Sequence, residues 1–402
     1  MVSGYGMEGG LKKSRSCDII IAGAGLAGFS LLYRAMQAGH WKDLTIIVVD
    51  KCTTSDRPTK NWSFWKRSTG PFDHLICKSW NNLSFFTNSG VRKDLDLNGY
   101  SYHTIKSQDF YTHCRAYLMG CKNISFIDDE ILTITTEDVQ CFLDTASHSL
   151  TSTYLFNSIY TKPRLEAETQ YFLQHFKGLL IKTSQPVLNP EEAYLMDFRT
   201  SQEHGTSFFY TLPMAANAVF VEYTIFSKTV IAEREYDEKL STYLRDVLKV
   251  REYEVAEHEY GVIPMTDHIF PRFQGNIINI GSAGGDTRGA TGYTFTNMQK
   301  TISSILTCWS ANGNPFFHSE NISLKHKIYD SCLLNVLNSG EYKGNKIFED
   351  LFMRSKASTI FAFLDAESML LEDVSVIASL KPWAFLKGMT AVLSSRFKSF
   401  LR

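Results

Sequence analysis

A carboxylate stands in the middle of a long apolar segment of the chain. Glu222 lies in the run YTLPMAANAVFVEYTIF (210–226), within the five residues FVEYT (220–224). Taking a carboxylate out of water is costly unless it is paired, hydrogen-bonded or protonated. A buried, protonated Glu222 would have a proton to give, which is the requirement for a general acid. The alternative is an edge strand whose alternation turns Glu222 towards solvent.

Three glycines near the N-terminus have a spacing that suits a dinucleotide. Gly23, Gly25 and Gly28 form GxGxxG between an apolar strand, DIIIA (18–22), and a helix that we expect to end near Gly39. Glycines at these positions let the backbone approach a pyrophosphate, and the helix N-terminus faces the charge of that group. The alternative is a tight glycine turn in an α/β protein that binds no nucleotide.

The strand after this helix supports the nucleotide interpretation. LTIIVVD (44–50) ends at Asp50, 22 residues after Gly28. An acid at the end of the second strand can accept a hydrogen bond from a ribose hydroxyl. We therefore expect Asp50 to bind the cofactor, together with Ala24 in the glycine turn.

A second strand–glycine–helix unit occurs late in the chain. NIINIGSAGGDTRGATGYTFTNMQKTISSIL (276–306) is expected to begin with a strand at 277–280 and to continue through a glycine-rich turn into a helix. A nicotinamide dehydrogenase needs only the first such unit, so two units with an insert between them favour FAD over NAD. In this second unit the expected cofactor-binding residues are Gly281, Ala283, Gly284, Gly285 and Gly292.

These elements predict an α/β fold. We expect an FAD-binding, Rossmann-type parallel sheet of the glutathione-reductase-like kind, an inserted antiparallel-sheet substrate domain and a helical C-terminus. The predicted parts are a disordered leader (1–14), a discontinuous FAD-binding domain (15–60 and 261–310), a substrate-binding domain with the Glu222 strand (61–260) and a helical C-terminal region (311–402).

Composition excludes several classes of protein. The 41 basic and 42 acidic residues nearly cancel, so no overall positive field predicts nucleic-acid binding. The 28 Phe, 19 Tyr and 6 Trp suit a long apolar cavity, or equally a large ordinary core. Eight scattered cysteines without a CxxC pair indicate a reducing, cytoplasmic compartment with neither a metal site nor structural disulfides. The sequence contains no run of 18 apolar residues, so it predicts no membrane-spanning helix.

The C-terminal tail combines basic and apolar residues. Residues 381–402 contain five basic side chains and no acid. Such a basic, amphipathic segment can lie in a membrane interface. The alternative is a helix that packs on the body of the protein and keeps its basic side in water.

Taken together, these segments resemble the lycopene cyclase family, flavoproteins that close the rings of carotenoids, and in particular its bacterial β-cyclases. The resemblance runs from DIIIAGAGLAG (18–28) to FAFLDAESMLLEDVSVI (361–377). Several motifs in the same order are more specific than any one of them. The further motifs that carry it are NWSFW (61–65), LMDFR (195–199), FFYTLP (208–213), FVEYT (220–224), YGVIPMT (260–266) and IGSAGGDTRGATGYTF (280–295).

The resemblance implies a role for Glu222 as the acid of ring closure. Many members of the family have a second acid at the next position, where this chain has Tyr223. On an alternating strand Tyr223 would face away from Glu222, so this departure need not remove the acid. Other departures are Ser282, where Thr is frequent, and the segment 288–290 (Arg-Gly-Ala), where Lys and Ser are usual. We expect these residues to lie by the flavin ring.

The implied reaction is the conversion of the ψ ends of lycopene into β-ionone rings. It needs reduced FAD, with NAD(P)H as a catalytic reductant, although no electrons are consumed overall, so the enzyme would be an isomerase. The electron-rich faces of aromatic rings suit the transient carbocation. The side chains expected in the substrate pocket are Tyr210, Phe220 and Tyr293. Because a linear carotenoid dissolves in lipid, we expect the protein on the inner face of the membrane, bound peripherally.

Other functions on the same fold stay open at the level of sequence. The protein could be a cyclase of another linear terpenoid, a flavin monooxygenase or an isoprenoid reductase. It could also be a carotenoid-binding flavoprotein without catalysis, for which Glu222 would be dispensable. The sequence does not distinguish a β from an ε ring, or one ring from two, and it predicts no oligomeric state.

Overall fold

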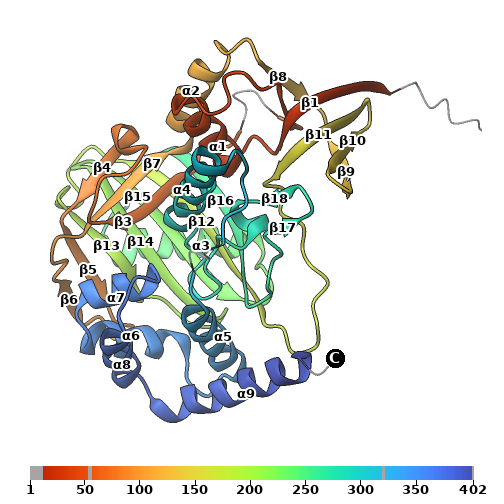
Figure 1. Ribbon diagram of the computed structural model, residues 1–402. Coiled ribbons are helices and arrows are strands. Elements are labelled where there is room, and N and C mark those ends of the chain that lie inside the picture. Colours follow the sequence, from red (N-terminus) through yellow and green to blue (C-terminus); the bar gives the residue numbers. More distant parts are fainter. Residues whose placement is uncertain (1–11, 53–56, 319–321, 401–402) are drawn as a thin grey trace, which may run out of the picture.

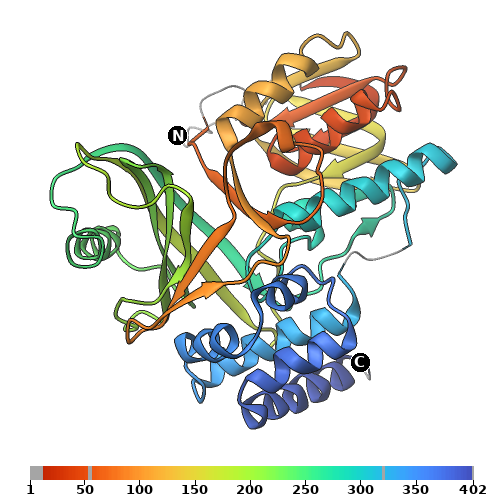
Figure 2. The ribbon, with the colours of Figure 1, turned by 90° about the vertical axis from the view of Figure 1, so that its left-hand side faces the viewer.

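The computed structural model describes residues 12–52, 57–318 and 322–400. A sheet with long helices, a second, mainly antiparallel sheet and a layer of C-terminal helices make up much of the molecule (Figures 1 and 2). The first sheet contains β1 (Lys13–Ala22), β2 (Ile46–Asp50), β8 (Ile124–Asp128), β9 (Ile131–Glu137), β10 (Gln140–Thr145), β11 (His148–Asn157), β17 (Phe273–Gln274) and β18 (Ile277–Asn279).

Two further sheets build the rest of the β-structure. The strands of the larger one are β5 (Asn82–Phe86), β6 (Arg92–Leu95), β12 (Tyr171–Lys182), β13 (Glu192–Asp197), β14 (Thr206–Ala215), β15 (Ala218–Ser227) and β16 (Glu254–Thr266). A three-stranded sheet consists of β3 (Asn61–Lys66), β4 (Ile76–Trp80) and β7 (Ser101–Lys106).

Helices cover the sheets and form the end of the described chain. The helices are α1 (Leu26–Gln37), α2 (Ser107–Leu118), α3 (Glu233–Asp246), α4 (Phe295–Asn312), α5 (Leu324–Ser339), α6 (Gly344–Arg354), α7 (Ala357–Leu364), α8 (Leu370–Ser379) and α9 (Pro382–Phe400). A 3-10 turn, Gly281–Gly284, follows β18. No helix in the described ranges is long and apolar enough to span a membrane.

The first sheet has a parallel centre, as the sequence predicts. β1 pairs in parallel with β2 on one side and with β11 on the other, and β18 continues the parallel set beside β11. Because alternate residues point to opposite faces, Ile19 and Ile21 pack with α1, α2 and α4, whereas Ile20 and Ala22 pack with side chains of β9–β11. Burial on both faces explains the unbroken apolar run of β1.

The larger sheet also has two covered faces. Odd-numbered residues of β15, among them Val221 and Tyr223, pack on Tyr236 and Tyr243 of α3. Figure 2 shows α3 on the outer side of this sheet. Even-numbered residues of β15 face the other way. β15 lies inside the sheet between β12 and β14, so Glu222 does not belong to an edge strand and the solvent-facing alternative is wrong.

The order of the segments differs from the expected domain boundaries. Residues 124–157 were expected in the substrate domain, yet β8 and β11 pair with β2 and β1 in the first sheet. The β9–β10–β11 segment is antiparallel within itself, which is the pattern visible in the sequence. Its parallel pairing with β1 depends on contacts more than 120 residues apart.

Two other boundaries move for similar reasons. β16 extends to Thr266 in the larger sheet, so residues 261–266 do not join the cofactor-binding part. At the N-terminus, β1 begins at Lys13, inside the range expected for a disordered leader. Residues 1–11 of that leader lie outside the described residues.

Candidate active site

The inner face of β15 places Glu222 in a cavity between the larger sheet, the three-stranded sheet and the segment before α4. The side chain is 9% exposed, and the Thr224 hydroxyl donates a hydrogen bond to Glu222 Oε1 at 2.8 Å. The cavity has a volume of about 270 Å³ and receives residues from β3, β12, β14, β15, β16 and the segment before α4. The expected acid is therefore buried, but it lines an open space.

A second buried carboxylate, Glu259, lines the same cavity from β16. It is 5% exposed. The backbone N–H and the side-chain amide of Asn61 both donate to Glu259 Oε2, each at 2.9 Å. Asn61 is the first residue of the NWSFW motif, so this motif anchors one carboxylate of the site.

Strand register explains why the two glutamates meet in one cavity. Gly178 of β12 is paired with Glu222 on β15 and with Glu259 on β16. Directly paired residues point to the same face of a sheet, so all three lie in one row. A Cβ on Gly178 would be 2.5 Å from Cζ of Phe220, whose ring therefore lies over this glycine.

Burial favours the protonated form of both carboxyl groups. Burial and, after it, the nearby charge of Glu259 together raise the pKa of Glu222 to about 8. Burial also raises the pKa of Glu259 to about 7, although the Asn61 hydrogen bonds oppose this shift. The ammonium group of Lys60, at the cavity wall, lowers both pKa values. At neutral pH the site therefore holds a neutral Glu222.

Aromatic side chains form much of the remaining wall. Tyr210, Phe220 and Tyr293, the three expected pocket residues, all line the cavity with Tyr102. The hydroxyl groups of Tyr210 and Tyr293 lie 3.2 Å apart. Burial raises the pKa of both tyrosines, so they stay neutral phenols. The cavity therefore offers π-faces, and cations are attracted to π-faces.

The first glycine turn fits a pyrophosphate. α1 begins after Gly25 with neither a side-chain cap nor an acid in its first turn, so its N–H groups are available to an anion. A Cβ on Gly25 would meet only Arg57 Nη1, at 4.0 Å, whereas one on Gly28 would be 2.0 Å from the Gly23 carbonyl oxygen. Gly25 therefore borders open space, and Gly28 allows close packing of helix and strand.

Asp50 supports this turn directly. Its Oδ2 accepts from the Ala24 N–H at 2.7 Å and pairs with Arg57 at 2.7 Å. The carboxylate thus holds the glycine turn in place, at the end of β2, where the fold binds a ribose. Both predicted residues lie together as expected.

The second glycine segment closes the space between α1 and the cavity. A Cβ on Gly281 would be 2.9 Å from the Ala27 Cβ, and one on Gly292 would be 2.3 Å from Gln174 Oε1. That oxygen is buried without a hydrogen-bond partner among the described residues, so it can accept from a bound group. The N-terminus of α4 also has no side-chain cap and no acid in its first turn. These features fit a flavin, whose ring carries N–H and carbonyl groups.

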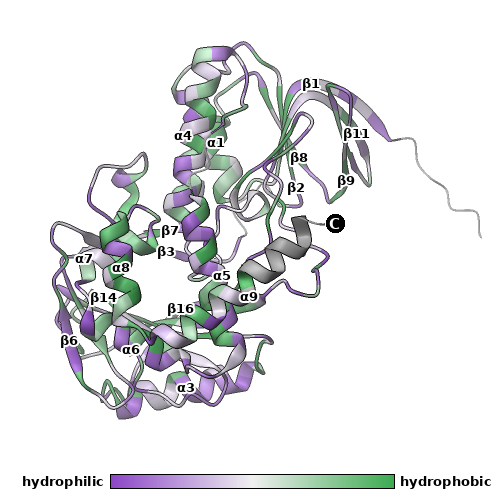
Figure 3. Cartoon of the chain, turned by 60° about the horizontal axis from the view of Figure 1, so that its bottom comes forward, coloured by the Kyte–Doolittle hydropathy of each residue, from purple (hydrophilic) through white to green (hydrophobic). Residues whose placement is uncertain are grey.

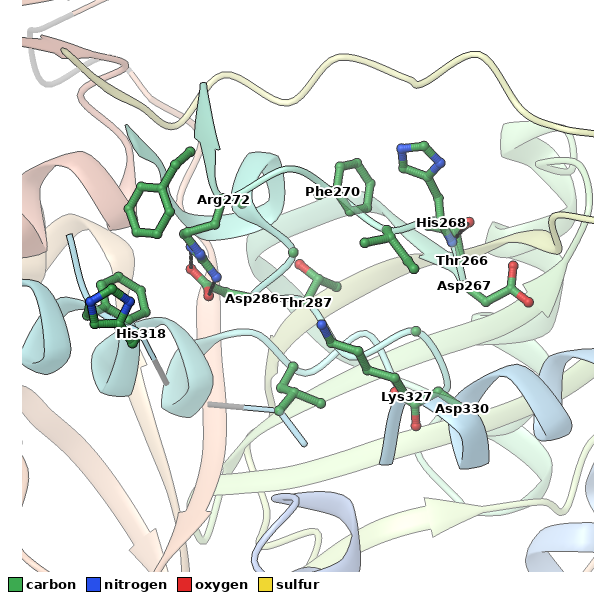
Figure 4. Close-up of a pocket in the computed structure, with 17 residues that line it drawn as sticks. Thr266, Asp267, His268, Phe270, Arg272, Asp286, Thr287, His318, Lys327 and Asp330 are labelled. Carbon is green, nitrogen blue, oxygen red and sulfur yellow. Dashed lines mark hydrogen bonds and ion pairs between the residues drawn. The ribbon is translucent and has the colours of Figure 1, made fainter. Parts of the chain in front are cut away.

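The other glycines of this segment lie at a different cavity. Gly284 and Gly285 line a space of about 300 Å³ between residues 266–273 and α5 (Figure 4). Its wall includes Asp286, which pairs with Arg272 at 2.7 Å and accepts from the Gly281 N–H. Neither glycine lines the cavity of Glu222, and Ala283 is half-buried in the 3-10 turn. Within the described ranges, no group of three potential ligands could hold a metal ion.

Comparison with known proteins agrees with this geometry. The family model described as "Lycopene cyclase protein" matches residues 18–390. The chain belongs to the lycopene cyclase family. No curated protein sequence matches it.

Several solved structures resemble this lycopene cyclase family member in fold. A geranylgeranyl bacteriochlorophyll reductase-like protein from Thermoplasma acidophilum has a TM-score of 0.59 at 11% identity, over 94% of this chain and all of that one. A flavoprotein/dehydrogenase from Cytophaga hutchinsonii also has 0.59 at 11%, over 90% and 100%. The halogenase PltM, in complex with phloroglucinol and FAD, has 0.55 at 12%, over 89% of each chain. At these identities the likeness shows the fold alone.

The departures from the family pattern have separate locations. Tyr223 faces α3, on the side of the sheet opposite to Glu222. Arg288 is 1% exposed and pairs with Asp330 of α5 at 2.6 Å. It also donates to the carbonyl oxygen of Leu364. Arg288 therefore points into the helical layer, and the structure corrects the expectation that its side chain lies by the flavin ring. The described contact of Ser282 is with the hydroxyl of Thr287, at 2.8 Å.

Glu259 is a carboxylate of the candidate site that the sequence did not predict. It directly precedes the YGVIPMT motif, which drew attention to residues 260–266 only. The sequence pattern that could have indicated it is the alternation of a strand, because Glu257, Glu259, Gly261 and Ile263 all point to the same face. A strand with carboxylates on the same face as a glycine and an apolar residue suggests a polar pocket.

We predict that Gly25→Val removes flavin while the protein stays folded. The new side chain enters open space, and the backbone at Gly25 has φ −77°, which valine adopts without strain. The matched variant Gly28→Val must displace the Gly23 carbonyl, which costs about 1–3 kcal/mol or more. Flavin absorbance and the thermal unfolding midpoint of each purified protein measure the two effects. Full flavin content in Gly25→Val would contradict the assignment of the turn.

Burial of Glu222 predicts a pH-dependent change in stability. Because the pKa of Glu222 is raised, its contribution to the free energy of unfolding is fully present below about pH 4.5. This contribution is lost as the pH rises through about 8. Glu222→Gln cannot ionise, so it does not lose this stability at high pH. The difference between its unfolding midpoint and that of the wild type should therefore be roughly 2–5 °C larger at pH 9 than at pH 5. The control is Glu254→Gln, at the exposed start of β16. A pH-independent difference for Glu222→Gln would contradict its burial as an acid.

Proposed function

We propose that this protein is a lycopene β-cyclase that converts the ψ ends of lycopene into β-ionone rings, giving γ-carotene and then β-carotene. The observation that carries the proposal is a carboxyl group, Glu222, buried among aromatic walls beside a flavin-type glycine segment, where burial raises its pKa to about 8. A ψ end is an apolar pair of alkenes that offers no hydrogen-bonding group. A cavity with a proton to give and with π-faces suits such a substrate.

The reaction uses the proton of Glu222. Transfer of this proton to the terminal double bond leaves a carbocation on the adjacent carbon. The neighbouring alkene attacks that carbon, and a carbon–carbon bond closes the ring. Loss of a proton from the ring then forms the new double bond, so the reaction is an isomerisation without net oxidation.

The residues of this chain protect the cation from side reactions. Tyr210, Tyr293 and Phe220 surround the reacting end and exclude water, which would otherwise capture the cation. Their neutral rings can stabilise positive charge without bonding to it. Because burial keeps the phenol groups neutral, no phenolate is present to take a proton prematurely.

The proposed cofactor is reduced FAD, held by the glycine turn of Gly23–Gly28, by Asp50 and by the segment 281–292. When bound, it supplies an electron-rich ring whose negative charge stabilises a nearby cation. NAD(P)H is the proposed reductant and is needed only in catalytic amounts. A monooxygenase or reductase on the same fold would instead consume NAD(P)H stoichiometrically.

An apolar cavity in the helical layer supports a long apolar substrate. Its volume is about 80 Å³, its wall is almost entirely hydrophobic, and it lies among α5–α9. Thr291 lines both this cavity and that of Glu222. We propose that the substrate is lycopene or a related linear carotenoid, whose reacting end enters the cavity of Glu222.

We further propose peripheral binding to the inner face of the membrane. Large apolar side chains are exposed at the start of α8 and of α9, including Leu371 at 86% and Trp383 at 83%. α8 is coloured largely as hydrophobic in Figure 3. The expected basic tail is partly packed on the body, because α9 contacts α5 and Val392 is buried. Side chains of residues 393–402 lie outside the described part.

The catalytic proposal predicts that Glu222→Gln abolishes ring formation. The variant keeps the shape of the side chain but has no acidic proton, and loss of a general acid lowers turnover by about 10²–10⁴-fold. Glu222→Asp should retain a little activity, because its proton lies about one methylene farther away. Tyr223→Phe is the control, since this side chain faces α3. The measurement is pigment chromatography of cells that accumulate lycopene, with flavin content checked on purified protein. Wild-type conversion by Glu222→Gln would refute the assignment.

The membrane proposal predicts a loss of binding in the double variant Leu370→Ser, Leu371→Ser. Removing two exposed leucines from an interface should weaken binding to anionic vesicles by roughly 100-fold. Leu132→Ser, at an exposed site in β9, is the matched control. Co-sedimentation with vesicles measures both variants. Unchanged binding of the double variant would remove α8 from the membrane surface.

A further inference from the structure

The cavity of Glu222 contains a second carboxylate that a single-acid mechanism does not use. Ring closure needs two proton transfers, one to the terminal alkene and one from the closed ring. We propose that Glu222 and Glu259 divide these transfers: Glu222 gives the first proton, and Glu259 removes the second as the base. This inference rests on the proposed cyclase function and assigns a role to a residue outside the FVEYT motif.

The first argument is position. Glu222 and Glu259 enter the cavity from strands on either side of β12, both opposite Gly178. Two strand spacings put their Cα atoms about 10 Å apart. Gly178 has no side chain, and the ring of Phe220 takes that place between the two glutamates and lines the cavity. The reacting end can therefore lie on the Phe220 ring with a carboxyl group on each side.

The second argument is the unequal hydrogen bonding of the two carboxyl groups. Two N–H groups of Asn61 donate to one oxygen of Glu259, an arrangement that stabilises an anion. Among the described residues, the hydrogen-bond partner of Glu222 is a single hydroxyl, that of Thr224. One proton shared by the pair therefore resides on Glu222 and leaves Glu259 as the carboxylate.

The other charged and titratable groups around the pair fit this division. Lys60 lies at the cavity wall and favours one negative charge in the pair. Glu257, two residues before Glu259 on β16, is paired with Lys106 and does not line the cavity. The remaining titratable groups of the wall are tyrosines, Tyr102, Tyr210 and Tyr293, whose pKa values burial raises. No other carboxyl group of the described residues lines this cavity.

The proton balance closes over one ring. The O–H bond of Glu222 breaks, and its proton forms a C–H bond at the terminal alkene. After the ring bond forms, the cation is on the methyl-bearing ring carbon. The adjacent carbon, which has just formed the ring bond, loses its hydrogen to Glu259, and the C–H electrons become the ring double bond. Glu222 is then the anion and Glu259 the acid, and transfer of one proton between them restores the start. No oxidant or reductant is consumed.

The position of the base also decides which ring forms. The same cation gives a β ring when the hydrogen leaves the newly bonded carbon, but an ε ring when it leaves the ring CH₂ group on the other side. A fixed carboxylate at one of these hydrogens selects one product. Glu259 therefore acts on specificity as well as on rate, whereas a purely structural residue would affect the rate alone.

The test compares the purified, FAD-loaded wild type with Glu259→Gln, using lycopene and lycopene deuterated at the carbon that loses the hydrogen. We expect turnover to fall about 10²–10⁴-fold, the fraction of β rings to fall, and the isotope effect to rise because proton removal becomes rate-limiting. Glu257→Gln is the matched control on the same strand and should keep the wild-type ring type and isotope effect. If Glu259→Gln does not fold, Glu259→Asp, with a carboxylate one methylene shorter, should show the same rise with a smaller loss of rate.

Three results are distinguishable. If the Glu259 variant keeps the wild-type ring type and isotope effect, whatever its turnover rate, the role of Glu259 as a base is overturned and the cyclase function stays intact. The same changes in Glu257→Gln would also overturn it, because the effect would then be general to β16. A wild-type enzyme that leaves lycopene unchanged would instead refute the proposed function itself.

Discussion

The site depends on keeping a carboxyl group out of water without filling the space in front of it. Burial penalises the charged form of Glu222, so the fold itself keeps the proton in place. This needs β15 in the interior of its sheet, with neighbours on both sides and α3 on its far face. It also needs a glycine opposite the carboxyl group, because the ring of Phe220 lies where a side chain of Gly178 would be.

The same constraint explains why the cavity is built from distant segments. Its walls come from residues 60–63, from β12, β14, β15 and β16, and from residues 291–295. Most of the motifs that define the family resemblance contribute residues to the wall of this cavity. LMDFR is different, because Asp197 is fully buried and accepts from the Tyr243 hydroxyl at 2.5 Å on the α3 side. That motif supports the strand from behind.

Sequence reasoning found the features that are local. Each glycine unit is a contiguous strand, turn and helix, and Glu222 is conspicuous because its own strand is apolar. The role of Glu259 was not visible, because it depends on the register of β12 against two other strands and on Asn61, 198 residues away. The place of residues 124–157 was missed for a similar reason: pairing between β1 and β11 leaves no local pattern beyond apolar strands.

Arg288 shows how a charged departure can be compatible with carbocation chemistry. A free cation beside the pocket would oppose the positive charge that the proposed reaction develops there. Both Asp330 oxygens accept from the Arg288 guanidinium, and the Leu364 carbonyl takes a third N–H. A carboxylate and a helix C-terminus are the partners that best compensate a buried guanidinium. The charge of Arg288 is therefore balanced within the helical layer, and its side chain borders the apolar cavity there, not the cavity of Glu222.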